Sequence, residues 1–340
     1  METQNVPHLL IFAPNWLGDA VMSLPAIADL RRALSGTVID IAARPSIAPL
    51  FKQVAGVNGV VALAGRRGSS RDASMTLRDR AYAAALLLTN SFQTALTAWR
   101  AGIPERWGFG SDWRGPLLTH AVRPPLDYMH QAAYYQHLTR ALGFASGPPE
   151  PRLEASAEDR RAGSELLVAA GWDRRTPLVA LAPGAAYGGA KRWPSESFTA
   201  LAAALARDGV RTVLVGGPGD ARAGEEVEKG TARIPIRVIS LVGRTDLPAL
   251  AGVLVQCRGL VTNDSGAMHF GAALGVSVIA MFGPTDERVT RPLGRDTGRE
   301  PVVLTHDVWC RPCLLRECPL THGCMRGIDV AAVLAALQKA

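Results

Sequence analysis

Short apolar runs alternate with longer amphipathic stretches along the first half of the chain. The predicted strands are residues 8–13, 37–43 and 83–89, and the predicted helices are residues 19–34, 91–101 and 131–142. Such alternation is typical of βαβ units around a parallel sheet. The Pro- and Arg-rich residues 103–125 are predicted to form a loop.

The same alternation continues in the second half. The predicted strands are residues 178–182, 211–216, 237–241, 259–262 and 276–282, and the predicted helices are residues 157–170, 195–208, 221–230, 247–256, 265–274 and 330–337. Three prolines in residues 147–151 separate the halves. We therefore expect an α/β fold with two doubly wound, Rossmann-like domains facing each other across a cleft. Ligands in such sheets bind at the carboxyl ends of strands, so the informative loops follow strands.

Composition indicates a globular protein of about two domains. Of 340 residues, 48% are apolar and 20% are charged, and no apolar run approaches the ~18 residues that span a bilayer. The first apolar run stops at Pro14 without the pattern of a secretory signal, so we expect a cytoplasmic chain. The net charge of +7 favours an anionic partner, although an Arg-rich solvated surface explains it equally well. No basic run or RNA-binding motif predicts nucleic-acid binding.

The loop after the first predicted strand, residues 14–19 (PNWLGD), ends in a carboxylate. Gly18 allows a tight turn, and Asp19 lies at the start of a predicted helix. A carboxylate there suits a positioned base or a group that binds hydroxyls, and it equally suits a plain N-cap. The wide, rigid Trp16 beside it favours a site.

The loop at residues 183–194 (PGAAYGGAKRWP) carries two cations on a chain of small residues. Lys191 and Arg192 stand just before a helix that opens at Ser195. This combination suits phosphate, although the spacing of a Walker A loop is missing. The alternative is a solvated basic turn.

A third loop, residues 262–269 (TNDSGAMH), also joins a strand to a helix. Asp264 or Ser265 would cap the helix, and Gly266 lets the N–H groups of the first turn face an anion. His269 lies one turn beyond Ser265 on the same helix face. Alone, the sequence is common turn chemistry.

The cysteines fall into two groups. Cys257 lies on an apolar helix and is expected in the core. Four others lie within fifteen residues: Cys310, Cys313, Cys318 and Cys324. The first pair has C-x-x-C spacing and His322 is a further candidate ligand, so these residues are candidates for a structural zinc site. The later spacings match no standard metal pattern, which leaves free thiols as the alternative.

Taken together, the loops resemble a known family. The matching segments are residues 14–19, 89–92 (TNSF), 101–104 (AGIP), 183–185 with 190–194, and 261–266 with 268–269. In this order they resemble the bacterial ADP-heptose:lipopolysaccharide heptosyltransferases of glycosyltransferase family 9, most closely the heptosyltransferase II members. The resemblance extends over nearly the whole chain.

The resemblance implies a GT-B fold with three parts. Residues 1–155 would bind the acceptor, residues 156–326 would bind the nucleotide sugar, and residues 327–340 would form a helix that crosses back to the first domain. The implied reaction moves L-glycero-D-manno-heptose from ADP-heptose, with inversion, to a heptose on the Kdo–lipid A inner core. Such an acceptor implies peripheral contact with the cytoplasmic face of the inner membrane.

The resemblance also assigns roles to residues. Asp19 matches the general base, Lys191 the partner of the donor phosphate, and Asp264 the acid that contacts the heptose. The other matching positions are Arg192, Ser265, Gly266 and His269 on the donor side and Asn15, Trp16 and Asn90 on the acceptor side. The Arg-rich residues 66–67 and 106–114 are candidates to grip phosphates of the core.

Neither a metal nor another cofactor is expected. The chain has no Asp-x-Asp, the usual carboxylate pair for a metal-bound sugar diphosphate, so cations and helix N–H groups would replace the metal. Two alternatives stay open. One is a related transferase, such as heptosyltransferase I or III or another nucleotide-sugar enzyme of the same fold. The other is a bilobal sugar-binding protein.

Overall fold

The computed structural model describes residues 6–63, 70–294 and 300–339. The chain divides into two compact units, Met1–Pro151 and Arg152–Ala340. Each unit contains one six-stranded sheet in which all neighbouring strands run parallel. The predicted α/β class with two doubly wound sheets is confirmed. Among the described residues, no helix has the length and apolar character needed to cross a membrane.

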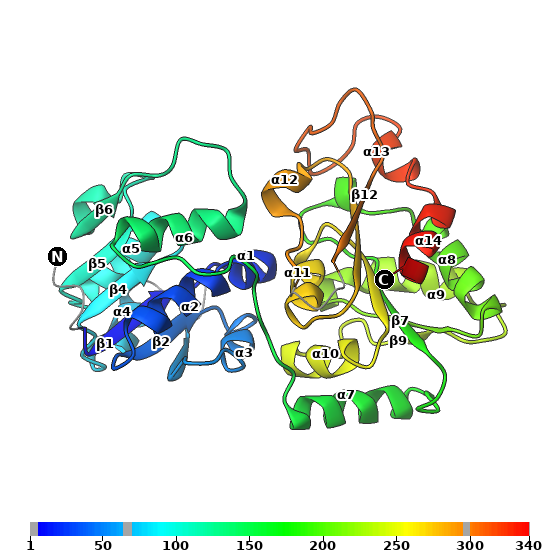
Figure 1. The fold of residues 1–340 in the computed structure, drawn as a ribbon, viewed down its shortest axis with the longest axis horizontal. Coiled ribbons are helices and arrows are strands. Elements are labelled where there is room, and N and C mark those ends of the chain that lie inside the picture. Colours follow the sequence, from blue (N-terminus) through cyan, green and yellow to red (C-terminus); the bar gives the residue numbers. More distant parts are fainter. Residues whose placement is uncertain (1–5, 64–69, 295–299, 340) are drawn as a thin grey trace. The chain divides into compact units, whose positions relative to one another are not determined.

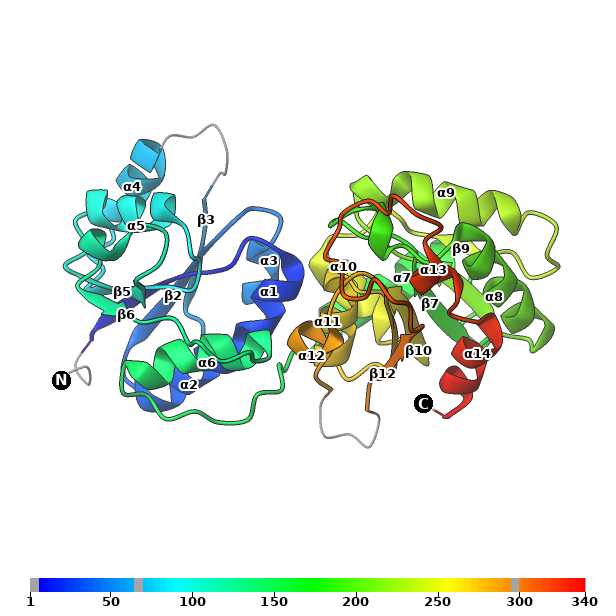
Figure 2. The same ribbon diagram turned by 90° about the horizontal axis from the view of Figure 1, so that it is seen from above.

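The sheet of the first unit has the strand order β3-β2-β1-β4-β5-β6. The strands are β1 (His8–Phe12), β2 (Val38–Ala43), β3 (Gly59–Ala62), β4 (Ala84–Leu87), β5 (Glu105–Phe109) and β6 (His120–Val122). The helices are α1 (Leu17–Met22), α2 (Leu24–Ala33), α3 (Ala48–Phe51), α4 (Ser70–Arg78), α5 (Phe92–Arg100), α6 (Gln131–Ala141) and the 3-10 helix η1 (Gly115–Leu117). Helices α2 and α6 cover one face of the sheet, and α4 and α5 cover the other (Figure 2).

The order of the central strands brings two loops of interest to one edge. Ile11 of β1 pairs with Ile41 of β2 and with Leu86 of β4, and all three side chains are fully buried. Because parallel strands end at the same edge, the loops after β1 and β4 emerge side by side. The first of these loops leads into the turn of α1 that contains Asp19, and the second contains Asn90.

The sheet of the second unit has the strand order β12-β11-β10-β7-β8-β9. The strands are β7 (Leu178–Ala182), β8 (Arg211–Leu214), β9 (Ile239–Ser240), β10 (Gly259–Asn263), β11 (Val278–Phe282) and β12 (Val302–Thr305). The helices are α7 (Ala157–Ala169), α8 (Ser195–Arg207), α9 (Ala221–Gly230), α10 (Leu247–Leu254), α11 (Gly266–Ala273), α12 (Glu287–Thr290), α13 (Gly323–Arg326) and α14 (Val330–Lys339), with the 3-10 helices η2 (Gly189–Lys191) and η3 (Pro218–Asp220).

Helices cover both faces of this sheet as well. Helices α7, α10 and α11 lie on one side, and α8, α9 and α14 lie on the other (Figure 1). Helices α7 and α10 can approach closely because Gly163 of α7 contacts Gly252 of α10. A Cβ added to Gly163 would lie 2.2 Å from the backbone of Gly252. Helix α14 packs on α8 and β11 of its own unit, with Val333 and Leu337 in the core.

Two predictions about local structure are wrong. The predicted helix 19–34 is divided into α1 and α2 at Ser23, because Pro25 has no N–H with which to continue a helix. Residues 103–125 are not simply a loop, since they contain β5, η1 and β6. Strand β5 begins with Glu105 and Arg106, and β6 is a three-residue edge strand, so neither produces an apolar run.

Candidate functional site

The loop after β1 places a carboxylate in the first turn of α1. Trp16 is the N-cap residue of this helix, and its side chain is 59% exposed. Asp19 lies within the first turn and is half-buried, as is Asn15 in the preceding loop. The interpretation of Asp19 as a plain N-cap is therefore wrong, because another residue holds that position.

Tyr135 of α6 lies beside Asp19. The tyrosine is 4% exposed, and its hydroxyl shares a hydrogen bond with the Asp19 carboxylate. Burial, and then the negative charge of Asp19, raise the pKa of Tyr135 well above its ordinary value. The hydroxyl therefore stays protonated and donates to the carboxylate. Sequence reasoning missed Tyr135, although a buried tyrosine on an amphipathic helix needs a polar partner.

Asn90, in the loop after β4, is held from two sides. Its amide donates to the Tyr134 hydroxyl at 2.8 Å, and its carbonyl oxygen accepts from Nη2 of Arg114 at 2.9 Å. Arg114 is fully buried and also donates to the backbone oxygens of Phe109, at 2.7 Å, and Thr89. The predicted acceptor residue Asn90 is thus oriented by an arginine that sequence reasoning had assigned elsewhere.

The Arg-rich stretch at residues 106–114 does not offer the expected phosphate grip. Arg114 is enclosed, and burial lowers the pKa of its guanidinium. Arg106 donates to the backbone oxygens of Leu117 at 2.6 Å and Ile103 at 2.5 Å. Both guanidiniums therefore organise the turns around β5. The other candidates, Arg66 and Arg67, lie outside the described residues.

In the second unit, Lys191 forms an ion pair with Asp264. The loop after β7 ends in η2, and Nζ of Lys191 lies 2.5 Å from Oδ2 of Asp264. The side chains are 12% and 5% exposed, respectively. The ammonium also lies 4.7 Å from the centre of the Tyr187 ring, a cation–π distance. The two loops predicted to bind donor therefore contact each other through opposite charges.

Asn263 joins the same two loops through neutral hydrogen bonds. Its oxygen accepts from the Trp193 N–H at 2.8 Å, and its amide nitrogen donates to the backbone oxygens of Pro183, at 2.9 Å, and Gly184, at 3.2 Å. Asn263 is fully buried. Sequence reasoning included it in a motif without assigning it a role. The sequence does not show that the amide of Asn263 is buried at the end of a central strand, so its role becomes visible only in the structure.

Helix α11 begins directly after Asp264. Ser265 is its N-cap and Gly266 its first residue, whereas the Asp264 carboxylate points to Lys191 and accepts a hydrogen bond from the Thr285 hydroxyl at 2.6 Å. His269 is 5% exposed within the helix. Of the two predicted caps, Ser265 occupies the position.

Arg192 lies next to Lys191 but makes different contacts. Its Nε is buried and has no hydrogen-bond partner among the described residues. Its charge contributes to lowering the pKa of Glu226, after the larger effects of hydrogen bonds from Ser195 and Arg222.

The cysteine-rich segment, residues 310–324, supports the Lys191 loop. Leu314 accepts a hydrogen bond from the Tyr187 hydroxyl at 2.7 Å. Three further contacts join the two segments: the Ala190 N–H donates to Arg316 O at 2.9 Å, the Gly189 N–H donates to Oε1 of Glu317 at 2.9 Å, and Nε2 of His322 lies 2.7 Å from Ala190 O. The segment therefore contributes to the shape of the loop that carries Lys191.

The thiols of this segment are free. Burial first, and then the neighbouring Cys310, Cys318 and Cys313, raise the pKa of Cys324. Within residues 6–63, 70–294 and 300–339, no group of three or more His, Cys, Asp or Glu side chains is arranged to hold a metal ion. The geometry therefore gives no support to the zinc candidate, and His322 contacts a backbone oxygen instead.

The two units carry complementary chemistry. The first holds a carboxylate beside a protonated tyrosine, and the second holds a cation, a carboxylate and the N-terminus of α11 at one sheet edge. A base and a set of groups that neutralise a departing phosphate are what transfer to a hydroxyl requires.

Comparisons with known proteins agree with this chemistry. Residues 71–323 match the family described as glycosyltransferase family 9 (heptosyltransferase). Lipopolysaccharide heptosyltransferase 2 of Salmonella typhimurium is 31% identical over 299 residues, which cover 84% of this chain and 85% of that protein. The Escherichia coli protein of the same name is 29% identical over 301 residues, with the same shares covered.

Solved structures show the same fold. The structure of E. coli ADP-heptose lps heptosyltransferase II has a TM-score of 0.81 and 28% identity, with 97% of each chain covered. A glycosyl transferase family 9 protein from Veillonella parvula has a TM-score of 0.85 and 22% identity, with 100% of this chain and 99% of that chain covered. The expected GT-B class is confirmed.

Proposed function

The chain belongs to glycosyltransferase family 9, the heptosyltransferase family, and from this premise we propose a specific reaction. It transfers L-glycero-D-manno-heptose from ADP-heptose to a heptose already attached to the Kdo–lipid A inner core of lipopolysaccharide, as a heptosyltransferase II. The observation that carries the proposal is the buried Lys191–Asp264 pair beside the N-terminus of α11. Because the family is one of enzymes, the alternative of a bilobal sugar-binding protein is wrong.

On the donor side, Lys191 neutralises the leaving diphosphate. An ammonium has three N–H donors, and Asp264 accepts from one of them. The N–H groups at the start of α11, around Ser265 and Gly266, favour a second phosphate charge. Arg192 adds positive charge beside this loop, and Asp264 contacts a hydroxyl of the heptose. His269, which is as buried as Asp264 and lies in the first turns of α11, is proposed as a further residue of the donor site.

On the acceptor side, Asp19 takes the proton from the attacking hydroxyl. The acceptor oxygen forms a bond to the anomeric carbon while the bond from that carbon to the diphosphate oxygen breaks. ADP leaves with the electron pair, so a single displacement inverts the anomeric configuration. Asn15, Trp16 and Asn90, from the loops after β1 and β4, contact the acceptor, and the bond from Arg114 fixes the amide of Asn90.

We propose that the reaction needs no metal ion or other cofactor. The chain lacks the Asp-x-Asp pair that usually binds a metal-bound sugar diphosphate. The positive charge of Lys191 and the helix N–H groups would supply the electrostatic stabilisation instead. We expect full activity in the presence of EDTA, and a strict requirement for added magnesium would contradict the proposal.

We also propose that the enzyme works in the cytoplasm, in peripheral contact with the inner membrane. Helices α4 and α5 pack together, and their outer side exposes Met75 (60%), Phe92 (46%) and Trp99 (53%). Arg71, Arg78 and Arg100 are exposed on the same two helices. Apolar side chains among arginines favour the surface of an anionic bilayer.

Vesicle sedimentation tests this contact. Vesicles of phosphatidylethanolamine and phosphatidylglycerol should bind the wild-type protein and should bind a Trp99→Ser, Arg100→Gln variant much less. Trp309→Ser, an exposed tryptophan of the other unit, is the matched control. Equal binding of all three proteins would contradict the assignment of this surface.

A product analysis tests the reaction itself. Purified protein is incubated with ADP-heptose and Kdo–lipid A cores that carry no heptose, one heptose or two heptoses, and the products are weighed. We expect only the one-heptose core to gain a single heptose. Reaction of the heptose-free core would indicate heptosyltransferase I, and reaction of the two-heptose core would indicate heptosyltransferase III. If no core reacts, the proposed function is wrong.

A further inference from the structure

A cavity of about 420 Å³ opens in the second unit, between the loop that follows β11 and the segment that follows β12. Its volume falls within the usual range for small-molecule sites, roughly 300–1,000 Å³. The lining residues that matter here are Thr285, Glu287, Asp307, Trp309 and Arg311. No step of the reaction proposed above uses these side chains.

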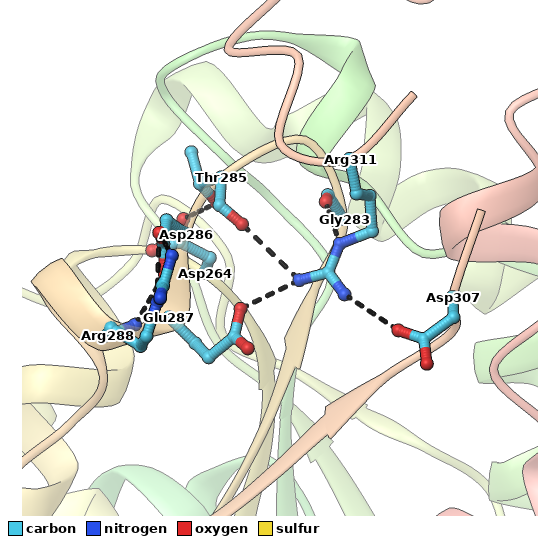
Figure 3. A network of polar contacts seen from close by, with 8 residues as sticks. All are labelled: Asp264, Gly283, Thr285, Asp286, Glu287, Arg288, Asp307 and Arg311. Carbon is cyan, nitrogen blue, oxygen red and sulfur yellow. Dashed lines mark hydrogen bonds and ion pairs between the residues drawn. The ribbon is translucent and has the colours of Figure 1, made fainter. Parts of the chain in front are cut away.

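The cavity adjoins the Lys191–Asp264 pair. The Thr285 hydroxyl, on the cavity wall, donates to Oδ2 of Asp264 at 2.6 Å. The same oxygen lies 2.5 Å from Nζ of Lys191. Figure 3 shows the two contacts of Thr285: its hydroxyl donates to Asp264, and its backbone oxygen lies 3.4 Å from Nη2 of Arg311. Thr285 is therefore shared by the cavity wall and the surroundings of the Lys191–Asp264 pair.

The charges in the cavity do not favour a second phosphate. Arg311 is only 11% exposed, and it donates to Gly283 O at 2.7 Å and to Oε2 of Glu287 at 2.8 Å. Its Nη1 lies 3.8 Å from Oδ1 of Asp307. The guanidinium is thus committed to groups of the protein, and three carboxylates face two guanidiniums across the lining. An additional anion would meet a slight excess of negative charge.

The same groups suit a neutral, hydroxyl-rich ligand. A carboxylate has about four lone-pair positions. Glu287 accepts one hydrogen bond from Arg311, and Asp307 forms only a 3.8 Å ion pair with it, so both carboxylates can also accept from hydroxyls. The Asp307 side chain is fully exposed, and Trp309 is 89% exposed at the rim. An indole offers an apolar face with a polar edge, which suits the C–H surface of a sugar ring.

We propose that this cavity is a sugar subsite, in which Trp309 covers one ring face and Glu287 and Asp307 accept hydrogen bonds from its hydroxyls. The proposal rests on the proposed function, because it takes the sugar from a substrate of that reaction. Two substrates supply this chemistry: the heptose of the donor and a sugar of the acceptor core.

Binding and kinetic measurements on two variants test the subsite and separate the two sources. Trp309→Ala and Asp307→Asn change exposed side chains, so folding should be unaffected, which melting temperatures check. Trp113→Ala, a 95% exposed tryptophan of the first unit, is the matched control. Calorimetry measures the Kd of ADP and of ADP-heptose, and initial rates give the KM of the one-heptose core.

Each result has a distinct meaning. If the donor heptose occupies the cavity, both variants weaken ADP-heptose about tenfold and leave ADP unchanged, the equivalent of about 1.4 kcal/mol. If an acceptor sugar occupies it, the acceptor KM rises by a similar factor while both Kd values stay constant. Variants that match the Trp113→Ala control in all three quantities overturn the subsite. Wild-type protein that binds ADP-heptose but modifies no core overturns the proposed function, while the Kd comparison still decides whether the donor sugar uses the cavity.

Discussion

Nζ of Lys191 lies 2.5 Å from Oδ2 of Asp264, and both side chains are largely buried. The two charges depend on each other, because the attraction between them offsets the free-energy cost of removing each from water. The pair also connects the loops that follow β7 and β10, two neighbouring strands. Any change at one residue therefore alters both stability and the potential that a phosphate would meet.

Lys191→Ala should weaken ADP binding and also lower stability. Removing the cation leaves Asp264 buried without its partner, which typically costs about 3–5 kcal/mol. The double variant Lys191→Ala, Asp264→Asn removes both charges, so we expect its melting temperature to recover while the Kd of ADP stays at least about tenfold above that of the wild type. Calorimetry and thermal melts measure the two effects separately. Recovery of ADP affinity in the double variant would show that Lys191 acts only through stability.

Asp19→Asn should affect turnover and leave the donor in place. Loss of a general base lowers rates by about 10²-fold or more. The residues that we propose to bind ADP-heptose lie in the other unit, so its Kd should stay near normal. Asp79→Asn, at an exposed aspartate of the same unit, is the control for loss of one negative charge. Wild-type turnover in Asp19→Asn would exclude the base.

Tyr135→Phe should move the acid limb of the pH profile. The hydroxyl donates to Asp19, and a carboxylate that loses a donor becomes harder to ionise, so its pKa rises. The acid limb of kcat/KM should therefore shift to higher pH. The ordinary pKa of a tyrosine is about 10, and that of Tyr135 is raised above this value. Ionisation of Tyr135 therefore adds no second limb to the pH profile of kcat/KM below about pH 10.

The neighbouring Tyr134→Phe provides the comparison. Tyr134 accepts a hydrogen bond from Asn90 rather than contacting the carboxylate. We expect its acid limb to match that of the wild type. Identical profiles for all three proteins would show that Tyr135 does not influence Asp19.

Arg114→Ala should act on stability rather than on recognition of core phosphates. The substitution leaves the backbone oxygens of Phe109 and Thr89 without their donor inside the unit, and each such loss costs about 1–3 kcal/mol. We expect a clear fall in melting temperature and the same ratio of KM values for phosphorylated and dephosphorylated cores. Arg123→Ala, at an exposed position, should leave the melting temperature unchanged. A changed KM ratio in Arg114→Ala would contradict the structural role.

Thiol labelling should separate the cysteines by burial. Burial raises the pKa of Cys257 to about 12, so almost none of it is thiolate at pH 8. With iodoacetamide at pH 8 we expect Cys310, Cys313 and Cys318 to react first, Cys324 more slowly and Cys257 last, as followed by mass spectrometry. Protection of the first three until a chelator is added would instead indicate a bound metal.

Local patterns of apolar and polar residues predicted much of the secondary structure. Strand β7 and helix α9 have the predicted bounds, because their apolar periodicity depends only on neighbouring residues. Strand β6 was missed because a short edge strand is stabilised by its partner more than by its own side chains. Strand β5 lies inside the sheet and was missed because it begins with the charged residues Glu105 and Arg106. The division between α1 and α2 could have been predicted from Pro25.

By itself, the sequence determined which loops follow strands and which charged residues those loops carry, since both depend on short-range pattern. Only the tertiary structure decided that Lys191 pairs with Asp264, that Tyr135 donates to Asp19 and that Arg114 is buried behind Asn90. These relationships join residues far apart in the chain. They depend on the order of strands in each sheet and on the cost of burying an unpaired polar group. Neither factor can be predicted from the pattern of neighbouring residues.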